Sequence, residues 1–159
     1  SKKPNFNQAI VHYKKAIQFK PNYSEAHFNL GVTLNKWNHS EEAIGYLEEA
    51  IKLEPNFFQA HLALGNIFIL KDNFKRALYH LETTIKIDPN NSIAHNSLGS
   101  ILGHQGNLKK AIIHFNTSLK LNPFNGEAHQ NLGTALAGMG SPKQSLYHLK
   151  IAKELESKK

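Results

Sequence analysis

Histidine is the residue type in this sequence best suited to chemistry, because an imidazole can bind a metal ion or exchange a proton near neutral pH. Eight of the ten histidines recur in a pattern: His12, His27, His61, His80, His95, His114, His129 and His148. Zinc sites on a helix commonly place two histidine ligands four residues apart, and none of these eight lies four residues from another. The pattern therefore favours partly buried packing residues over ligands. We expect no metal and no cofactor.

Catalytic motifs are the second kind of chemistry to test. The sequence has no phosphate-binding glycine loop, no nucleophile elbow and no His-Glu-x-x-His zinc motif. The absence of cysteine excludes disulfides, thiolate zinc sites and cysteine nucleophiles. Glu41, Glu42, Glu48 and Glu49 lie on one stretch, but lysines lie near them in the sequence, which is typical of a solvated helix face. We therefore predict that this chain is not an enzyme.

A 34-residue repeat organises the elements that carry these side chains. The prolines Pro21, Pro55, Pro89 and Pro123 are each 34 residues apart, and so are Leu30–Gly31, Leu64–Gly65, Leu98–Gly99 and Leu132–Gly133. A fixed period of this length with these residue types indicates stacked helical repeats. The boundaries that we predict are a partial repeat over 1–23 and full repeats over 24–57, 58–91, 92–125 and 126–159.

Each repeat is expected to form two helices. In the third repeat, apolar residues recur at helical spacing over Ser92–His104, and a second apolar stripe begins at Leu108. Asn107 is a plausible N-cap for that second helix, and Pro123 ends it because proline cannot continue a helix. The same punctuation in the other repeats predicts nine helices, and therefore an all-α solenoid of antiparallel helix pairs.

Glycine inside the first helix of each repeat has a structural interpretation. Glycine in a helix interior costs about 1 kcal/mol relative to alanine. A residue that is locally unfavourable and recurs in all four copies is best explained by close helix–helix approach. Ala43, Ala77 and Ala111 on the partner helices fit the same account, and Ser145 occupies that position in the fourth repeat.

The chain resembles the tetratricopeptide repeat (TPR) family over essentially its whole length. It departs from the family pattern at the fourth position of each repeat, where histidine replaces the usual aromatic residue. The sub-pattern Ala-His-x-Asn-Leu-Gly at 26–31 and 128–133 is similar to repeats of O-linked N-acetylglucosamine transferases, although many other TPR proteins share it. The resemblance implies a right-handed superhelix of about nine helices, whose first helices line a concave groove.

The same resemblance places the candidate binding residues on that concave face. An amide side chain both donates and accepts hydrogen bonds, so asparagines there could pair with the backbone of an extended peptide. The alternative is ordinary surface asparagine in a chain rich in that residue. Apolar side chains beside them would form a patch in the first half of the groove. The predicted peptide-binding residues are Phe28, Asn29, Val32, Leu62, Asn66, Asn96, Ser97, Gln130 and Asn131.

Other partner classes fit the sequence less well. The basic and amide residues with which some TPR domains clamp a peptide carboxylate are missing, because Phe28, Val32, Ala63, Ile93 and Ser97 occupy the matching positions. The formal net charge is +7, but the lysines are spread along the second helices, so we expect no nucleic-acid partner. No apolar run is long enough to span a bilayer, and no membrane association is expected.

The leading functional hypothesis is a protein-interaction scaffold that binds an extended peptide or a partner helix. The alternative is the substrate-recruiting arm of a larger transferase-type enzyme. Residues 1–23 supply a second helix without its partner, and the apolar residues there are too many for one helix to bury. We therefore expect either a piece of a longer array or self-association through this N-terminal helix.

Overall fold

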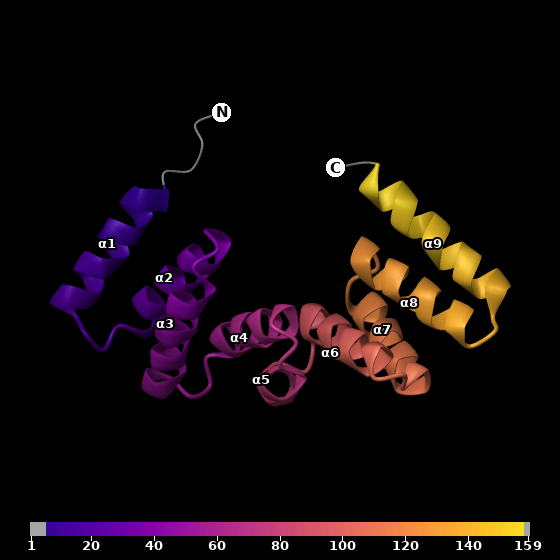
Figure 1. Cartoon of the computed structure of the whole chain (residues 1–159), viewed down its shortest axis with the longest axis horizontal. Coiled ribbons are helices and arrows are strands. Elements are labelled where there is room, and N and C mark those ends of the chain that lie inside the picture. The colour runs from indigo at the N-terminus through magenta and orange to yellow at the C-terminus, as the bar shows by residue number, and fades with distance from the viewer. Residues whose placement is uncertain (1–5, 158–159) are drawn as a thin grey trace. The chain divides into compact units, whose positions relative to one another are not determined.

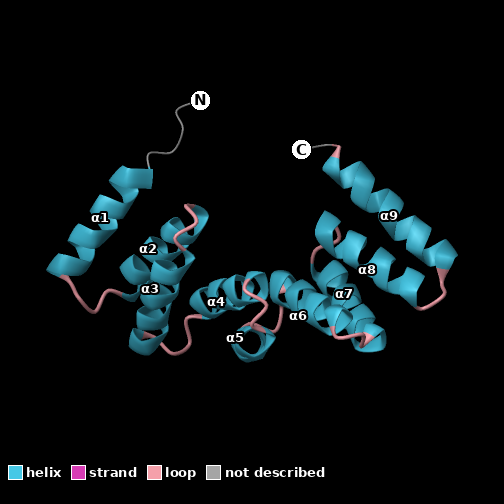
Figure 2. Ribbon diagram, viewed as in Figure 1, coloured by secondary structure: helices cyan, strands magenta, loops and turns pink. Residues whose placement is uncertain are grey.

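The computed structural model describes residues 6–157 of the chain, and those residues form helices joined by short turns (Figure 1). The helices are α1 (Phe6–Phe19), α2 (Ser24–Lys36), α3 (Ser40–Leu53), α4 (Phe58–Leu70), α5 (Phe74–Ile87), α6 (Ser92–His104), α7 (Leu108–Leu121), α8 (Gly126–Gly138) and α9 (Pro142–Glu156). No strand occurs within this described part of the chain (Figure 2). The prediction of an all-α helical solenoid is therefore confirmed.

The helix boundaries follow the punctuation of the sequence. Helix α6 covers Ser92–His104, as its apolar stripe predicts. Asn107 caps α7, because its side chain accepts a hydrogen bond from the backbone N–H of Lys110. Helix α7 ends before Pro123, and Pro142 occupies the first turn of α9, where its missing N–H costs nothing.

The turn between the two helices of each repeat needs one residue in the left-handed backbone region. This residue is Asn38 (φ 62°), Asp72 (φ 54°), Gly106 (φ 78°) or Gly140 (φ 73°), always at the same place in the repeat. Asparagine, aspartate and glycine tolerate this conformation better than other residues. The turn residues therefore differ in type but share one backbone requirement.

The chain divides into two compact units, residues 1–80 and 81–159, and each has its own core. In the first unit the side chains of Leu30, Leu47 and Leu64 are fully buried. In the second unit Phe115, Leu132 and Leu136 form one buried cluster with the small residues Ala111 and Ala135.

Close helix approach explains the interior glycines, as predicted. A Cβ atom on Gly31 would lie 2.7 Å from the Leu47 Cγ and 3.0 Å from the Ala43 carbonyl oxygen. On Gly133 it would lie 2.7 Å from the Leu149 Cγ and 3.1 Å from the Ser145 carbonyl oxygen. Both sites need glycine because a neighbouring backbone, which cannot move aside cheaply, occupies the space of the side chain.

Candidate functional site

The face of the first helices in the first unit carries an aromatic cleft. Phe28 on α2 packs against Phe57, with ring centroids 4.9 Å apart. The cleft has a volume of about 510 Å³ and is lined by Glu25, Phe28, Asn29, Glu54, Asn56, Phe57, Phe58 and Gln59. Of the predicted binding residues, Phe28 and Asn29 line this cleft and are half-buried. We call it the α2–α4 cleft.

Phe57 occupies a position that favours a different residue type. It is the N-cap of α4, and it makes no side-chain capping hydrogen bond. At the equivalent positions of the next two repeats, Asn91 accepts a hydrogen bond from Ala94 N–H and Asn125 accepts one from Ala128 N–H. Such a cap typically contributes about 1 kcal/mol. Phe57 therefore provides no capping hydrogen bond to α4, and its ring forms one wall of the cleft instead.

Two carboxylates at the rim of the cleft share one serine hydroxyl. The Ser24 Oγ lies 3.0 Å from Glu54 Oε2 and 3.2 Å from Glu25 Oε2. A hydroxyl has one hydrogen, so it can donate to only one of these oxygens at a time. The two exposed carboxylates therefore lie close together with a single donor between them.

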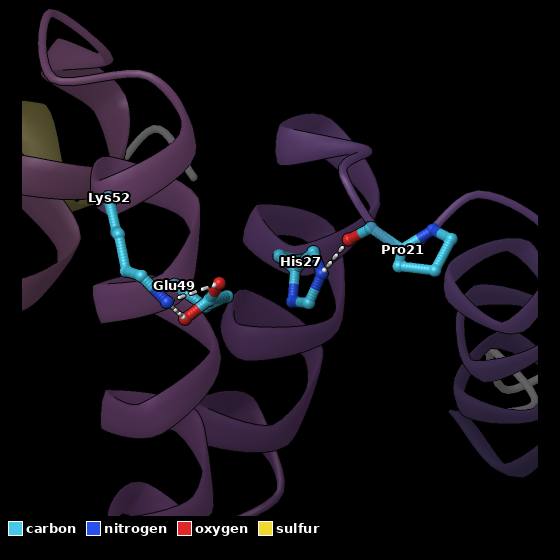
Figure 3. Close-up of polar contacts among 4 residues, drawn as sticks. All are labelled: Pro21, His27, Glu49 and Lys52. Atoms are coloured by element: carbon cyan, nitrogen blue, oxygen red, sulfur yellow. Dashed lines mark hydrogen bonds and ion pairs between the residues drawn. The ribbon is translucent and has the colours of Figure 1, made fainter.

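Three other carboxylates of this unit have lysine or arginine partners. Glu48 pairs with Arg76, and Glu41 pairs with Lys71. Glu49 accepts from Lys52, with Nζ to Oε1 at 3.0 Å (Figure 3). Within the described residues, no lysine or arginine forms such a pair with Glu25 or Glu54. The interpretation of residues 41–49 as a solvated face is thus refined, because three of these four glutamates carry lysine or arginine ion pairs.

The predicted amides of the second unit bond to one another. Asn131 Nδ2 donates to Asn96 Oδ1 at 3.1 Å, and Asn96 Nδ2 donates to Glu127 Oε1 at 3.1 Å. Asn96 and Ser97 are buried, with 3% and 8% of their surface exposed, whereas Gln130 is exposed. The structure therefore brings Asn96, Asn131 and Glu127 into one hydrogen-bonded network, in which Asn96 is buried, Asn131 is half-buried and Glu127 is exposed, and Gln130 lies outside it.

The remaining predicted residues lie in the first unit. Val32 on α2 is half-buried, and so are Leu62 and Asn66 on α4. None of the three lines the α2–α4 cleft. The set of nine predicted residues is therefore divided among a cleft, a hydrogen-bonded network and separate positions, and its role in peptide binding stays a prediction.

Pairs of histidines within single repeats are a feature that the sequence reasoning missed. The Nδ1 atoms of His61 and His80 lie 3.1 Å apart, those of His95 and His114 lie 3.1 Å apart, and those of His129 and His148 lie 2.9 Å apart. In every pair the two residues are 19 apart in the sequence. This constant separation is the feature of the sequence that could have revealed the pairs, because it connects a position on the first helix of a repeat with the facing position on the second helix.

The proline of the repeat sets the tautomer of each pair. His61 Nε2 lies 3.1 Å from the Pro55 carbonyl oxygen, and a carbonyl can only accept. His61 therefore carries its hydrogen on Nε2 and offers a bare Nδ1, so that the His80 Nδ1 must be the donor. His95 with Pro89 and His129 with Pro123 repeat this arrangement.

The first full repeat lacks the second histidine. His27 Nε2 donates to the Pro21 carbonyl oxygen at 2.9 Å (Figure 3), but the position 19 residues later is Tyr46. The His27 Nδ1 is buried and has no hydrogen-bond partner. The expectation of partial burial holds for His27 but is wrong for His12, which is exposed on α1 because no preceding first helix in the described residues covers it.

Burial lowers the pKa of the paired histidines. The pKa of His80 falls to about 4, first because burial disfavours the charged form and then because His61 and Arg76 add positive charge nearby. Burial also lowers the pKa of His61, His114 and His148. These imidazoles are therefore neutral near pH 7. The described residues contain no group of three or more histidine or carboxylate side chains placed to hold a metal ion.

Comparisons with protein families identify the repeat. Residues 3–36 match a TPR repeat model, and residues 24–57 and 80–113 each match a tetratricopeptide repeat model. Two of these matches begin at a different point of the repeat from the boundaries that we predict. No curated protein matches the chain significantly.

Solved structures resemble the chain over nearly its whole length. A crystal structure of MamA has 27% sequence identity and a TM-score of 0.83, and the match covers 97% of this chain and 90% of that chain. MamA from Desulfovibrio magneticus RS-1 has 24% identity and a TM-score of 0.84, with coverage of 98% and 88%. YrrB, a TPR protein with an unusual peptide-binding site, has 21% identity and a TM-score of 0.75, with coverage of 96% and 78%.

No helix in the part of the chain that the structure describes is long and apolar enough to cross a membrane. The resemblance of residues 26–31 and 128–133 to transferase repeats gains no support from these matches, and it stays a prediction from sequence.

Proposed function

Because the chain is built of tetratricopeptide repeats, we propose that it is a protein-interaction module that binds an extended peptide segment of a partner on its first helices. The α2–α4 cleft is the observation that carries this proposal. It joins an aromatic wall, made by Phe28 and Phe57, to the amide of Asn29. A partner side chain can pack on the rings while the amide pairs with the partner backbone.

The alternative of a substrate-recruiting arm of a transferase-type enzyme rests on sequence resemblance alone. A protein-binding module and a recruiting arm would use the same face, so the binding mode can be tested without deciding between them.

Selection from a displayed library of random nine-residue peptides tests the proposal. Peptides that are enriched on the folded wild-type chain would then be titrated by fluorescence anisotropy against Phe28→Ala and Asn29→Ala. We expect Phe28→Ala to weaken binding by roughly 10- to 100-fold, because buried aromatic anchors dominate interfaces. Asn29→Ala should cost about 3- to 10-fold, the usual value of one hydrogen bond.

The control is a variant with the same fold and altered charge on a second helix. Lys109→Glu/Lys110→Glu changes two exposed side chains at the start of α7 and should leave the affinity nearly unchanged. Arg76 is unsuitable for this purpose, because it pairs with Glu48 and stacks on Phe68 at 4.0 Å. Loss of binding in the lysine variant, with full binding in the Phe28 variant, would contradict the proposal.

A further inference from the structure

We propose that the α2–α4 cleft selects a partner segment in which a lysine or arginine stands beside an apolar side chain. This inference rests on the proposed function and adds the chemical class of the partner. The apolar side chain would pack on Phe28 and Phe57, and the cation would lie between the Glu25 and Glu54 carboxylates.

The two carboxylates at the rim lie close together, and no lysine or arginine among the described residues forms an ion pair with either of them. Both lie within hydrogen-bond distance of the Ser24 Oγ, at 3.2 Å for Glu25 and 3.0 Å for Glu54. Their oxygens are therefore at most roughly 6 Å apart, a separation at which two like charges repel each other. One hydroxyl hydrogen cannot satisfy both. An ammonium or guanidinium group donates several hydrogen bonds and would neutralise the repulsion.

The α2–α4 cleft combines negative charge with an aromatic pair, whereas a second pocket that holds two glutamates, Glu127 and Glu156, has no aromatic residue in its lining. The chain has a formal net charge of +7, and Glu41, Glu48 and Glu49 each have a lysine or arginine partner. None of the residues that line the cleft is a lysine or an arginine. The cleft is thus an acidic site on a basic protein. A basic segment would be attracted here and repelled by most of the remaining surface.

The aromatic wall favours the same ligand. A cation over an aromatic face is attracted by the ring quadrupole, and the apolar stem of lysine or arginine packs on such rings. Phe57 stands where Asn91 and Asn125 cap the later repeats, and its largely buried ring packs on Phe28 at the wall of the cleft. The amides of Asn29, Asn56 and Gln59 on the same lining can pair with the backbone of the segment.

The peptide-library selection, repeated on matched variants, tests the inference. The test variant is Glu25→Gln/Glu54→Gln, which keeps size and polarity but removes both charges from exposed positions. The matched control is Glu82→Gln/Glu154→Gln, which makes the same change of net charge at exposed positions on α5 and α9. Circular dichroism would confirm that all proteins keep their helical content.

We expect wild type and control to enrich peptides with lysine or arginine at one position, next to an apolar residue. The test variant should still enrich peptides but lose the basic preference. Replacing the basic residue of a selected peptide by glutamine should weaken wild-type binding by roughly 5- to 30-fold and leave binding to the test variant unchanged.

Other outcomes separate the two proposals. Enrichment of peptides without a basic residue, or a basic preference that survives in the test variant, would overturn this inference and leave the proposed function standing. No enrichment on any of the proteins would overturn both. If wild type instead self-associates in a concentration-dependent way and the test variant does not, the cation belongs to a second copy of this chain, and the external basic partner is wrong.

Discussion

At the scale of single residues, hydrogen-bond direction decides where protons can bind in the histidine pairs. In the pair of His61 and His80, the Pro55 carbonyl oxygen holds a hydrogen on His61 Nε2, so the facing Nδ1 must stay bare. A proton added to His61 would place two N–H groups against each other. A proton on the His80 Nε2 would leave the hydrogen bond between the two Nδ1 atoms intact, but it would put a positive charge in a buried site beside Arg76. Either event opposes the packed state.

Stability should therefore fall as the pH drops. The folded pKa of His80 is about 4 and lies below the ordinary histidine value of 6.5, so the unfolded chain binds more protons between these values. The stability that the neutral form provides is complete above about pH 7 and is lost as the pH falls toward 4. From pH 7 to pH 5, His80 alone should cost about 2 kcal/mol of unfolding free energy.

Urea unfolding at pH 7 and pH 5 checks this value. The variant His61→Phe/His80→Leu removes both members of the pair, so it leaves no unpaired buried nitrogen in it, and its pH-dependent loss should be smaller by about 2 kcal/mol. His12→Gln changes an exposed histidine and should behave as wild type. An equal loss in wild type and in the double variant would show that the pair does not control the pH response.

The sequence predicted the burial of these histidines but not their pairing. The search for two histidines four residues apart compares positions on a single helix, whereas His61 and His80 lie on the two different helices of one repeat. Whether these two side chains meet depends on the rotation of each helix about its own axis, and the 34-residue period does not specify that rotation. The same limit applies to the shared contact of Glu25 and Glu54 with Ser24, because Glu54 lies in a loop whose path only the fold defines.

At the scale of elements, helix boundaries were predictable because local chemistry decides them. Asn107 caps, Pro123 terminates and Pro142 begins a helix in almost any tertiary context. Phe57 shows where local rules fail. Its position favours asparagine on local grounds, and the packing of its ring on Phe28 overrides that preference.

Two glycines of the first full repeat should respond to alanine with opposite signs. Gly31→Ala puts a Cβ atom 3.0 Å from the Ala43 carbonyl oxygen, so the helices must separate, and we expect a loss of about 1–3 kcal/mol. Gly45 on α3 has nothing within 4 Å of the added atom, so Gly45→Ala should stabilise by up to about 1 kcal/mol. Urea denaturation of both variants measures the difference. A similar sign for the two would mean that helix approach does not explain the recurrent glycine.

At the scale of the whole molecule, a repeat array is stabilised by the sum of its repeats and their interfaces. Helix α5 contributes four buried side chains, Ala77, His80, Leu81 and Thr84. In α9 the structure shows only Ser145 and Ala152 as buried. Ser145 also replaces the alanine that packs at the same position of the other repeats, so a hydroxyl occupies a buried position there.

Native-state hydrogen exchange should therefore show α9 opening before α5. After correction for intrinsic rates, amides in α9 should exchange faster than those in α5, because fewer buried contacts must break to expose them. Leu149→Ala removes the side chain that packs on Gly133, so it should accelerate exchange in α9 and leave α5 unchanged. Equal protection of the two helices in wild type, or equal acceleration in the variant, would mean that the array unfolds as one cooperative body.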